Sequence, residues 1–209
     1  MQSKGNELIT IAQRIRAMSQ TALAYSTNEY EIERCHELIT LSGRIVSIVA
    51  ETDENVIHAD YLPTKEYVTP KVDIRAVIFN ENDEILLVKE KADGKWSLPG
   101  GWADVGFTPE EVVVKETKEE TGYDTRTVRL LAVLDKRCYN HPTSPFYIYK
   151  LCFLCEIIGG DDNLTFDIMD KGFFSIDHLP PLSTDRILKE QITLLDQLRR
   201  DPLSNTYCD

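Results

Sequence analysis

The chain has 209 residues, of which 42% are hydrophobic and 28% charged, and its formal net charge is −12. This length predicts one ordinary domain with a smaller additional piece, and the acidity excludes DNA as an expected partner, because nonspecific binding to DNA depends on Lys and Arg that neutralise phosphates. No stretch approaches the roughly 18 apolar residues of a membrane span and the N-terminus lacks a signal-peptide pattern, so we expect no membrane partner and a cytoplasmic location.

The five cysteines do not predict a disulfide framework, because their number is odd and they are widely scattered. Cys152 and Cys155 have the spacing of half a zinc site, but they fall in an apolar run that reads as a strand, residues 146–158. Residues three apart on a strand face opposite sides, and no second pair supplies the remaining ligands. We therefore interpret this pair as structural.

Two helices are predicted in the first fifty residues. Apolar side chains recur every three or four residues on one face of the first helix: Leu8, Ile11, Ile15, Met18, Ala22 and Tyr25. Ser26 and Glu29 are spaced as a capping box for the second helix. Its apolar face is Ile32, Cys35, Ile39, Ser42, Val46 and Val49. Two helices alone cannot bury both faces, so the hairpin must pack on the rest of the chain or on a second copy.

The pattern changes after a polar segment, residues 51–70, which contains two prolines and reads as a linker. We place the domain boundary within it, so that residues 1–66 form an N-terminal helical region with its linker and residues 67–209 a second domain. Period-two and apolar runs then predict strands over 72–79, 84–90, 127–135 and 146–158. A final helix is predicted over residues 183–200, capped by Ser183 or Thr184. Strands mixed with helices in this order indicate an α+β fold built as a sandwich.

Residues 100–124 combine a glycine-rich loop with a helix that has clear ends. Thr108 is a predicted N-cap, with Pro109 at the first helical position and Glu111 three residues after the cap. Gly122 fits a C-terminal cap. The helix is therefore expected from about Pro109 to Thr121.

Three glutamates crowd the last turns of this helix. Glu116, Glu119 and Glu120 stand at i, i+3 and i+4 and therefore share one face. Their converging carboxylates form an oxygen cage suited to Mg²⁺ or Mn²⁺. The alternative is a solvated acidic helix face, which is the usual explanation for a run of charge.

The segment resembles the Nudix box, a motif of one glycine, five residues, a glutamate, seven residues and then Arg-Glu-aliphatic-any-Glu-Glu-any-Gly-aliphatic. Gly101 falls on the first glycine, Lys115 and Glu116 fall on the Arg-Glu pair, and Gly122 on the closing glycine. Glu119 and Glu120 fall on the Glu-Glu pair. The resemblance implies an α/β/α sandwich with a mixed sheet, preceded here by the small N-terminal helical hairpin. It also implies metal binding by the three glutamates, with a backbone carbonyl at Gly101 as a further ligand and Lys115 among the catalytic residues.

The box departs from the family pattern at three positions and fits it more loosely at a fourth, Tyr123. Phe107 replaces the first glutamate, and Lys115 replaces the arginine, which keeps the charge but loses the fork that can hold a carboxylate at two points. Thr117 and Tyr123 stand where aliphatic residues are usual. The three metal-binding glutamates are intact, so we expect metal binding to persist.

The resemblance extends over most of the chain to bacterial Nudix hydrolases of nucleoside diphosphates that carry another group and have a helical N-terminal extension. It implies metal-dependent hydrolysis of a pyrophosphate bond, with CDP-choline or ADP-ribose as the expected substrate. The expected substrate contacts are Arg137 for phosphate and Tyr139 or Trp102 for stacking on a base. The general base is left open among Glu116 and three further acids, Glu156, Asp167 and Asp170.

Two other functions remain open at this point. One is trimming of short RNA 3′ ends, which one group of these relatives also performs; the other is a nucleotide-binding regulator that has lost catalysis. The departures at Phe107 and Lys115 are the only support for the regulator. The apolar faces of the two N-terminal helices further predict a homodimer, since two-fold dimers are the commonest oligomers.

Overall fold

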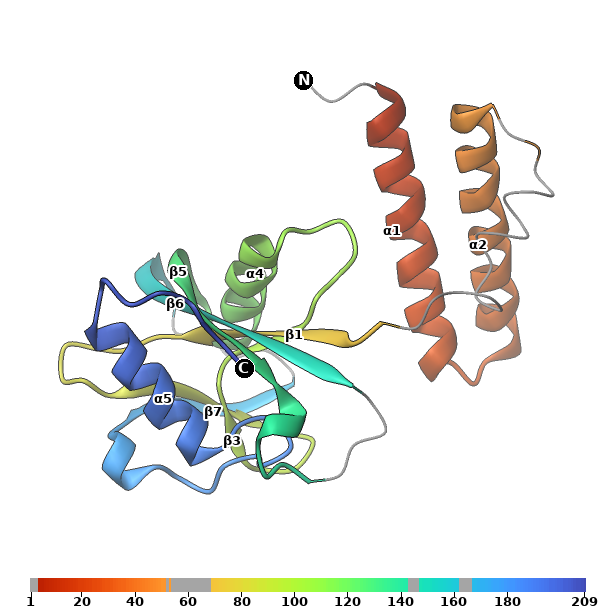
Figure 1. The fold of residues 1–209 in the computed structure, drawn as a ribbon. Coiled ribbons are helices and arrows are strands. Elements are labelled where there is room, and N and C mark those ends of the chain that lie inside the picture. The colour runs from red at the N-terminus through yellow and green to blue at the C-terminus, as the bar shows by residue number, and fades with distance from the viewer. Residues whose placement is uncertain (1–3, 52, 54–68, 143–146, 162–166) are drawn as a thin grey trace. The chain divides into compact units, whose positions relative to one another are not determined.

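The computed structural model describes residues 4–51, 53, 69–142, 147–161 and 167–209. The chain divides into two compact units, Met1–Val68 with Asp104–Gly106, and Thr69–Ala103 with Phe107–Asp209. The boundary predicted between residues 66 and 67, and most of the predicted linker, lie outside the described residues. Figure 1 shows the elements of each unit.

The first unit is a hairpin of two long helices, α1 (Lys4–Tyr25) and α2 (Glu29–Ala50). Asn28 is the N-cap of α2, and its side chain accepts hydrogen bonds from the backbone N–H groups of Tyr30 and Glu31. The predicted capping box of Ser26 and Glu29 is therefore wrong. The Ser26 hydroxyl instead donates to the Glu31 carboxylate over 2.8 Å.

The side chains buried in this hairpin are mostly small. They are Ala12 and Ser19 on α1, and Cys35, Ile39, Ser42, Gly43 and Ser47 on α2. The face predicted for the second helix thus points inward at its centre. The face predicted for the first helix does not, because Met18 and Tyr25 are 67% and 81% exposed and Leu8 and Ile11 are also exposed. Small residues let two helix backbones approach closely, so the buried seam follows them and the large apolar side chains stay outside.

The second unit contains a five-stranded and a three-stranded sheet. The larger sheet has the order β4 (Gly100–Trp102), β1 (Lys71–Val77), β6 (Ile148–Gly160), β5 (Tyr123–Asp135) and β8 (Tyr207–Cys208). It is mixed, because β1 runs parallel to β6 and β5 runs parallel to β8, whereas β1 with β4 and β5 with β6 are antiparallel. The smaller sheet, β3 (Trp96–Ser97), β2 (Ile85–Glu90) and β7 (Ile168–Phe174), is antiparallel.

A helix covers each face of this arrangement. Val112 and Val113 of α4 (Pro109–Thr121) pack with Ile74, Ala76 and Phe153 in one buried cluster. In the other cluster, Ile192 and Leu195 of α5 (Lys189–Arg200) pack with strand residues on the opposite face: Val77, Leu87, Leu131 and Cys152. The α/β/α sandwich with a mixed sheet is confirmed. Cys152 and Cys155 lie in different clusters, as their spacing on a strand predicts.

The two helix starts in this unit were predicted with different success. α4 begins and ends as expected, with a capping box between Thr108 and Glu111 and with Gly122 in the left-handed region at φ 73°. α5 begins at Lys189, so a cap at Ser183 or Thr184 is wrong. The Ser183 hydroxyl is engaged elsewhere and donates to Asp93 over 2.6 Å. Within the described ranges, no helix has both the length and the apolar character needed to cross a membrane.

Candidate active site

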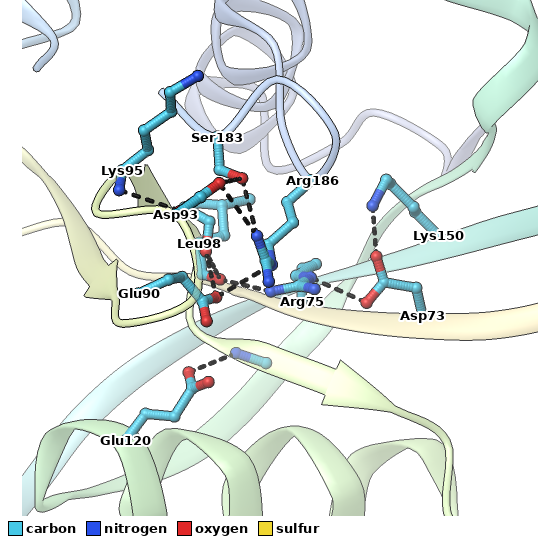
Figure 2. Close-up of polar contacts among 12 residues, drawn as sticks. Asp73, Arg75, Glu90, Asp93, Lys95, Leu98, Glu120, Lys150, Ser183 and Arg186 are labelled. Carbon is cyan, nitrogen blue, oxygen red and sulfur yellow. Dashed lines mark hydrogen bonds and ion pairs between the residues drawn. The ribbon is translucent and has the colours of Figure 1, made fainter. Parts of the chain in front are cut away.

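The last turn of α4 is bonded directly to the edge strand β4. The backbone N–H of Gly100 donates to the Glu120 carboxylate over 2.8 Å (Figure 2). Only glycine fits at this position, since its φ is +136° and an added Cβ would lie 2.0 Å from the Ile74 carbonyl oxygen. The close approach of β4 to β1 therefore brings a backbone donor up to a box glutamate.

Gly101, the next residue, makes room for a second box glutamate. A Cβ added to Gly101 would lie 2.9 Å from the Glu116 Oε2 atom, so the carboxylate occupies the space that a side chain would fill. Two carboxylates and a glycine backbone thus meet at β4. These are hard oxygen donors of the kind that Mg²⁺ and Mn²⁺ prefer, and the residues fit such an ion.

Lys115 stands among the carboxylates. Its ammonium lies 3.0 Å from Glu116 Oε1 and 3.3 Å from Glu119 Oε2. In the part of the chain that the structure describes, no group of three His, Cys, Asp or Glu side chains is arranged to hold a metal ion. Binding of a cation here therefore requires the Lys115 ammonium to give up its two contacts, and the more than half exposed Glu119 side chain to turn toward the other two glutamates.

The carboxyl group of Glu120 lies in surroundings that disfavour its negative charge. Burial raises its pKa to about 8, and the negative charges of Glu90 and Glu116 act in the same direction. The Arg75 guanidinium and the Gly100 N–H oppose this rise. A bound cation would offset the cost of burying the charged carboxylate and would displace its proton.

Sequence reasoning missed a cluster of buried charges beside the box loop, the segment Leu98–Gly101 that precedes the box helix. Arg75 on β1 donates to Asp73 over 2.9 Å and to the Leu98 carbonyl over 2.9 Å, and Asp73 is also paired with the Lys150 ammonium (Figure 2). All three charged side chains are almost completely buried. A signal was present in the sequence, because Asp73 and Arg75 interrupt an apolar strand at a spacing of two, which places them on one face.

Glu90 at the end of β2 is a second residue that the sequence analysis missed. Its carboxylate accepts a hydrogen bond from the Ser97 hydroxyl over 3.0 Å and lies 3.3 Å from Arg186 Nε. Arg186 also bonds Ser183 and Asp93, so the turn after β2 is tied to the segment before α5 (Figure 2). Glu90 adds negative charge that Glu120 and Arg75 both sense.

The predicted substrate contacts do not form one group in the described structure. Arg137 is exposed, pairs with Asp135 over 2.7 Å and stacks over Tyr147 at 4.2 Å. Tyr139 packs against the cluster under α5, and its hydroxyl donates to Asp209 over 3.1 Å. Arg137 is thus exposed but already paired with Asp135, whereas Tyr139 is engaged in packing.

Trp102 is the predicted contact nearest to the box loop. It is on β4 directly after Gly101, is 47% exposed and carries the Lys71 ammonium at 5.4 Å from its ring centroid. It pairs in register with Asp73, so its side chain is on the sheet face of the buried charges. Its neighbour Gly101 faces Glu116, so the Trp102 ring lies on the opposite face of the strand from the glutamates. An exposed aromatic ring at this sheet edge is suited to stack on a base.

The candidate bases outside the box lie in different surroundings. Glu156 is in an exposed ion pair with Arg126 at 2.6 Å. It follows Cys155, which packs in the α4 cluster, so Glu156 faces the opposite side of β6. The structure therefore does not bring Glu156 to the box glutamates.

Asp167 and Asp170 are exposed and belong to the β7 region. Lys171, beside Asp170, donates to the carbonyl of Thr121 at the C-terminal end of α4. β7 thus reaches the end of the box helix. Of these acids, Asp170 is the one adjacent in sequence to that contact.

Comparison with known proteins identifies both units. Residues 69–194 match the profile of the NUDIX domain, and residues 6–59 match that of the UDP-X-like, N-terminal oligomerisation domain. A Bacillus subtilis protein, YjhB, named provisionally as an ADP-ribose pyrophosphatase, is 44% identical over 95% of both chains. The ADP-ribose pyrophosphatase of Methanocaldococcus jannaschii is 34% identical over 59% of this chain and 74% of its own.

Two solved structures show the same architecture. The crystal structure of a UDP-X diphosphatase has a TM-score of 0.66 and 33% identity, covering 99% of this chain and 100% of that one. An ADP-ribose pyrophosphatase from Streptococcus suis has a TM-score of 0.62 and 43% identity, covering 68% of this chain and 100% of its own. The glutamates of α4, the glycines of β4 and these matches agree, and the chain is a member of the Nudix hydrolase family.

Proposed function

We propose that this Nudix hydrolase cleaves the pyrophosphate bond of a nucleoside diphosphate linked to a second group, with Mg²⁺ as its metal and Mn²⁺ as a substitute. The observation that carries the proposal is the meeting of Glu116 and Glu120 with the glycine backbone of β4. That meeting supplies oxygen donors next to two successive glycines, where a charged phosphate can come close to the backbone.

The reaction adds water across one P–O–P bond and leaves two phosphate monoesters. A divalent cation held by the carboxylates of Glu116, Glu119 and Glu120 and the carbonyl of Gly101 would neutralise the pyrophosphate charge and make water a better nucleophile. The chain's own contribution is to fix these donors. The Gly100 N–H holds Glu120, and Lys115 holds Glu116 and Glu119 in the metal-free protein. Trp102 offers an exposed stacking surface on the same strand.

ADP-ribose is the first substrate that we propose, followed by UDP-linked compounds. The relatives named above support this order, since YjhB and the Streptococcus suis protein carry the name ADP-ribose pyrophosphatase and the full-length structural relative is a UDP-X diphosphatase. CDP-choline remains in the panel because the sequence resemblance suggested it. Neither RNA trimming nor a purely regulatory role gains support from the described features.

The test is a panel assay of ADP-ribose, a UDP-sugar and CDP-choline, each with Mg²⁺, with Mn²⁺ and with a chelator. The proposal predicts release of two monophosphates from at least one of them, only with metal present. A metal-independent reaction, or no hydrolysis of any member, would contradict it.

We also propose that the protein is a homodimer joined by its N-terminal helices. The match to an oligomerisation domain and the exposed Leu8, Ile11, Met18 and Tyr25 of α1 support this assembly. Large apolar side chains that remain exposed each forfeit about 1.5 to 3 kcal/mol of burial, which a second copy can supply.

A further inference from the structure

The charged cluster beside the box loop has no role in the reaction described so far. We propose that Arg75 is a positioning residue, which holds the Leu98–Gly101 loop in the place where its backbone can serve the box glutamates. The inference rests on the proposed function, because the loop matters only if a metal site lies beside it.

Arg75 and its strand contact this loop at successive residues. Arg75 lies opposite Gly100 in the pairing of β1 with β4, and its Nη1 donates to the Leu98 carbonyl over 2.9 Å. The next N–H of β1, from Ala76, donates to the Pro99 carbonyl over 2.8 Å. Backbone pairing alone would fix Pro99 and Gly100. The Leu98 carbonyl, where the loop leaves the smaller sheet, accepts from the adjacent Ser97 hydroxyl over 3.3 Å and from the guanidinium, which is the contact that ties it to β1. The Arg75 side chain thus holds one end of a loop whose other end consists of two glycines.

The orientation of Arg75 is itself fixed. Its Nε donates to Asp73, which accepts from Lys150 on the neighbouring strand β6 (Figure 2). Three buried charges in a row are costly, and apolar residues of similar volume often serve stability as well or better. Stability is therefore a weak reason for this arrangement, whereas the fixed direction of a guanidinium fork is something that apolar residues cannot provide.

Arg75 also balances the charge of the site. After Asp73, the carboxylates that act most strongly on its charge are Glu120 and Glu90, and it attracts both. Arg75 thus holds the loop whose Gly100 N–H donates to Glu120, and it also attracts the Glu120 carboxylate, which accepts that bond. Loss of Arg75 should loosen both sides of that bond together.

The test compares Arg75→Lys and Arg75→Met with a matched control, Arg129→Met. Arg129 is a half-buried arginine that likewise donates to backbone carbonyls, those of Leu198, Asp201 and Ser204. Its contacts are with the C-terminal segment and not with the box loop. Arg75→Lys keeps the positive charge but lacks the fork that bonds Asp73 and Leu98 together.

Two readouts separate positioning from general stability. The first is amide hydrogen exchange of residues 97–102 in the metal-free protein, where both Arg75 variants should exchange about tenfold faster and Arg129→Met should match the wild type. The second is steady-state kinetics on the best substrate of the panel. Both Arg75 variants should lose about tenfold or more in kcat with KM within about twofold. The reason is that the loop positions the metal site, which acts on the chemical step, and is not proposed to set the affinity for the substrate.

Wild-type exchange and kcat in Arg75→Lys would overturn the inference, since this variant is expected to fold even if Arg75→Met does not. Faster exchange spread evenly over the domain would also overturn it, because that result means lost stability. The exchange readout needs neither metal nor substrate. If the wild type hydrolyses nothing, the proposed function fails while the positioning of the loop by Arg75 is still decided.

Discussion

Gly100 donates its backbone N–H to the Glu120 carboxylate over 2.8 Å, and this bond joins the edge of the mixed sheet to the last turn of the box helix. Gly101, the next residue of that strand, leaves room for the Glu116 carboxylate of the box helix. The two glycines thus have different tasks. Gly100 lets the backbone adopt a left-handed conformation close to β1, whereas Gly101 lets a carboxylate approach the backbone.

This difference predicts unlike effects for two similar substitutions. Gly100→Ala should destabilise the protein by about 3 kcal/mol or fail to fold, because φ is +136° and the new Cβ would lie 2.0 Å from the backbone oxygen of Ile74. Gly101→Ala should fold nearly normally but lose most of its activity, since the new Cβ meets only the movable end of Glu116 at 2.9 Å. Urea unfolding and turnover measured on both variants check this prediction. Equal loss of stability in the two would contradict it.

The pKa of Glu120 predicts how metal binding depends on pH. Burial raises this pKa from 4.5 to about 8, so the metal-free folded protein keeps a proton that the unfolded chain loses above about pH 4.5. The stability contributed by that proton is fully present below pH 4.5 and is lost as the pH rises through about 8. A cation must displace the same proton, so the affinity for Mn²⁺ should rise with pH by up to about tenfold per unit below pH 8.

Calorimetry of Mn²⁺ binding in two buffers with different ionisation enthalpies measures the proton release. At pH 7 we expect close to one proton per binding event, and Glu120→Gln should show neither the release nor the pH slope. An affinity that does not change between pH 6 and pH 8 would show that Glu120 is already ionised in the free protein.

The thiols are expected to fall into two classes. Cys138 and Cys208 are exposed, whereas Cys35, Cys152 and Cys155 are buried. Burial also raises the pKa of Cys152 and of Cys155 to about 12, so almost no thiolate forms there at pH 8. A thiol reagent should therefore modify two cysteines quickly in the native protein and all five after denaturation. Fast reaction of a third thiol under native conditions would contradict the packing described here.

The dimer can be tested with a matched pair of exposed apolar residues. Met18 on α1 is 67% exposed and Leu203 near the C-terminus is 91% exposed. If the N-terminal helices form the interface, Met18→Glu should shift sedimentation toward the monomer, while Leu203→Glu should leave the mass unchanged. The separate piece of residues 69–209 should likewise sediment as a monomer. A wild-type protein that is monomeric at micromolar concentration would rule out the dimer.

Local chemistry explains which elements could be predicted from the sequence. The start of α4 depends on residues within four positions of one another, Thr108, Pro109 and Glu111, and its end on Gly122, so a short stretch of sequence determines both. The opposite placement of Cys152 and Cys155 follows from strand geometry in the same way. The presence of the three glutamates on one helix could also be predicted, because it needs only helical spacing.

Features that depend on distant residues were not predictable. Ser183 has a good capping side chain, but its hydroxyl donates to Asp93, ninety positions earlier in the sequence. α5 therefore begins only at Lys189. The prediction for the buried face of α1 was wrong because that face depends on the partner helix. α2 presents small residues such as Ser42 and Gly43, and a close contact between two helices forms where both have small residues. The role of Arg75 depends on Leu98 and Lys150, and no local pattern brings these residues together.

The most direct measurement for the account as a whole is turnover of the best substrate by Glu120→Gln and Glu119→Gln at millimolar Mg²⁺, with circular dichroism as a check of the fold. Each change removes one carboxylate charge at nearly constant volume, so we expect folded proteins whose kcat is lower by about two orders of magnitude or more. Wild-type turnover by either folded variant would contradict the assignment of these glutamates as metal ligands.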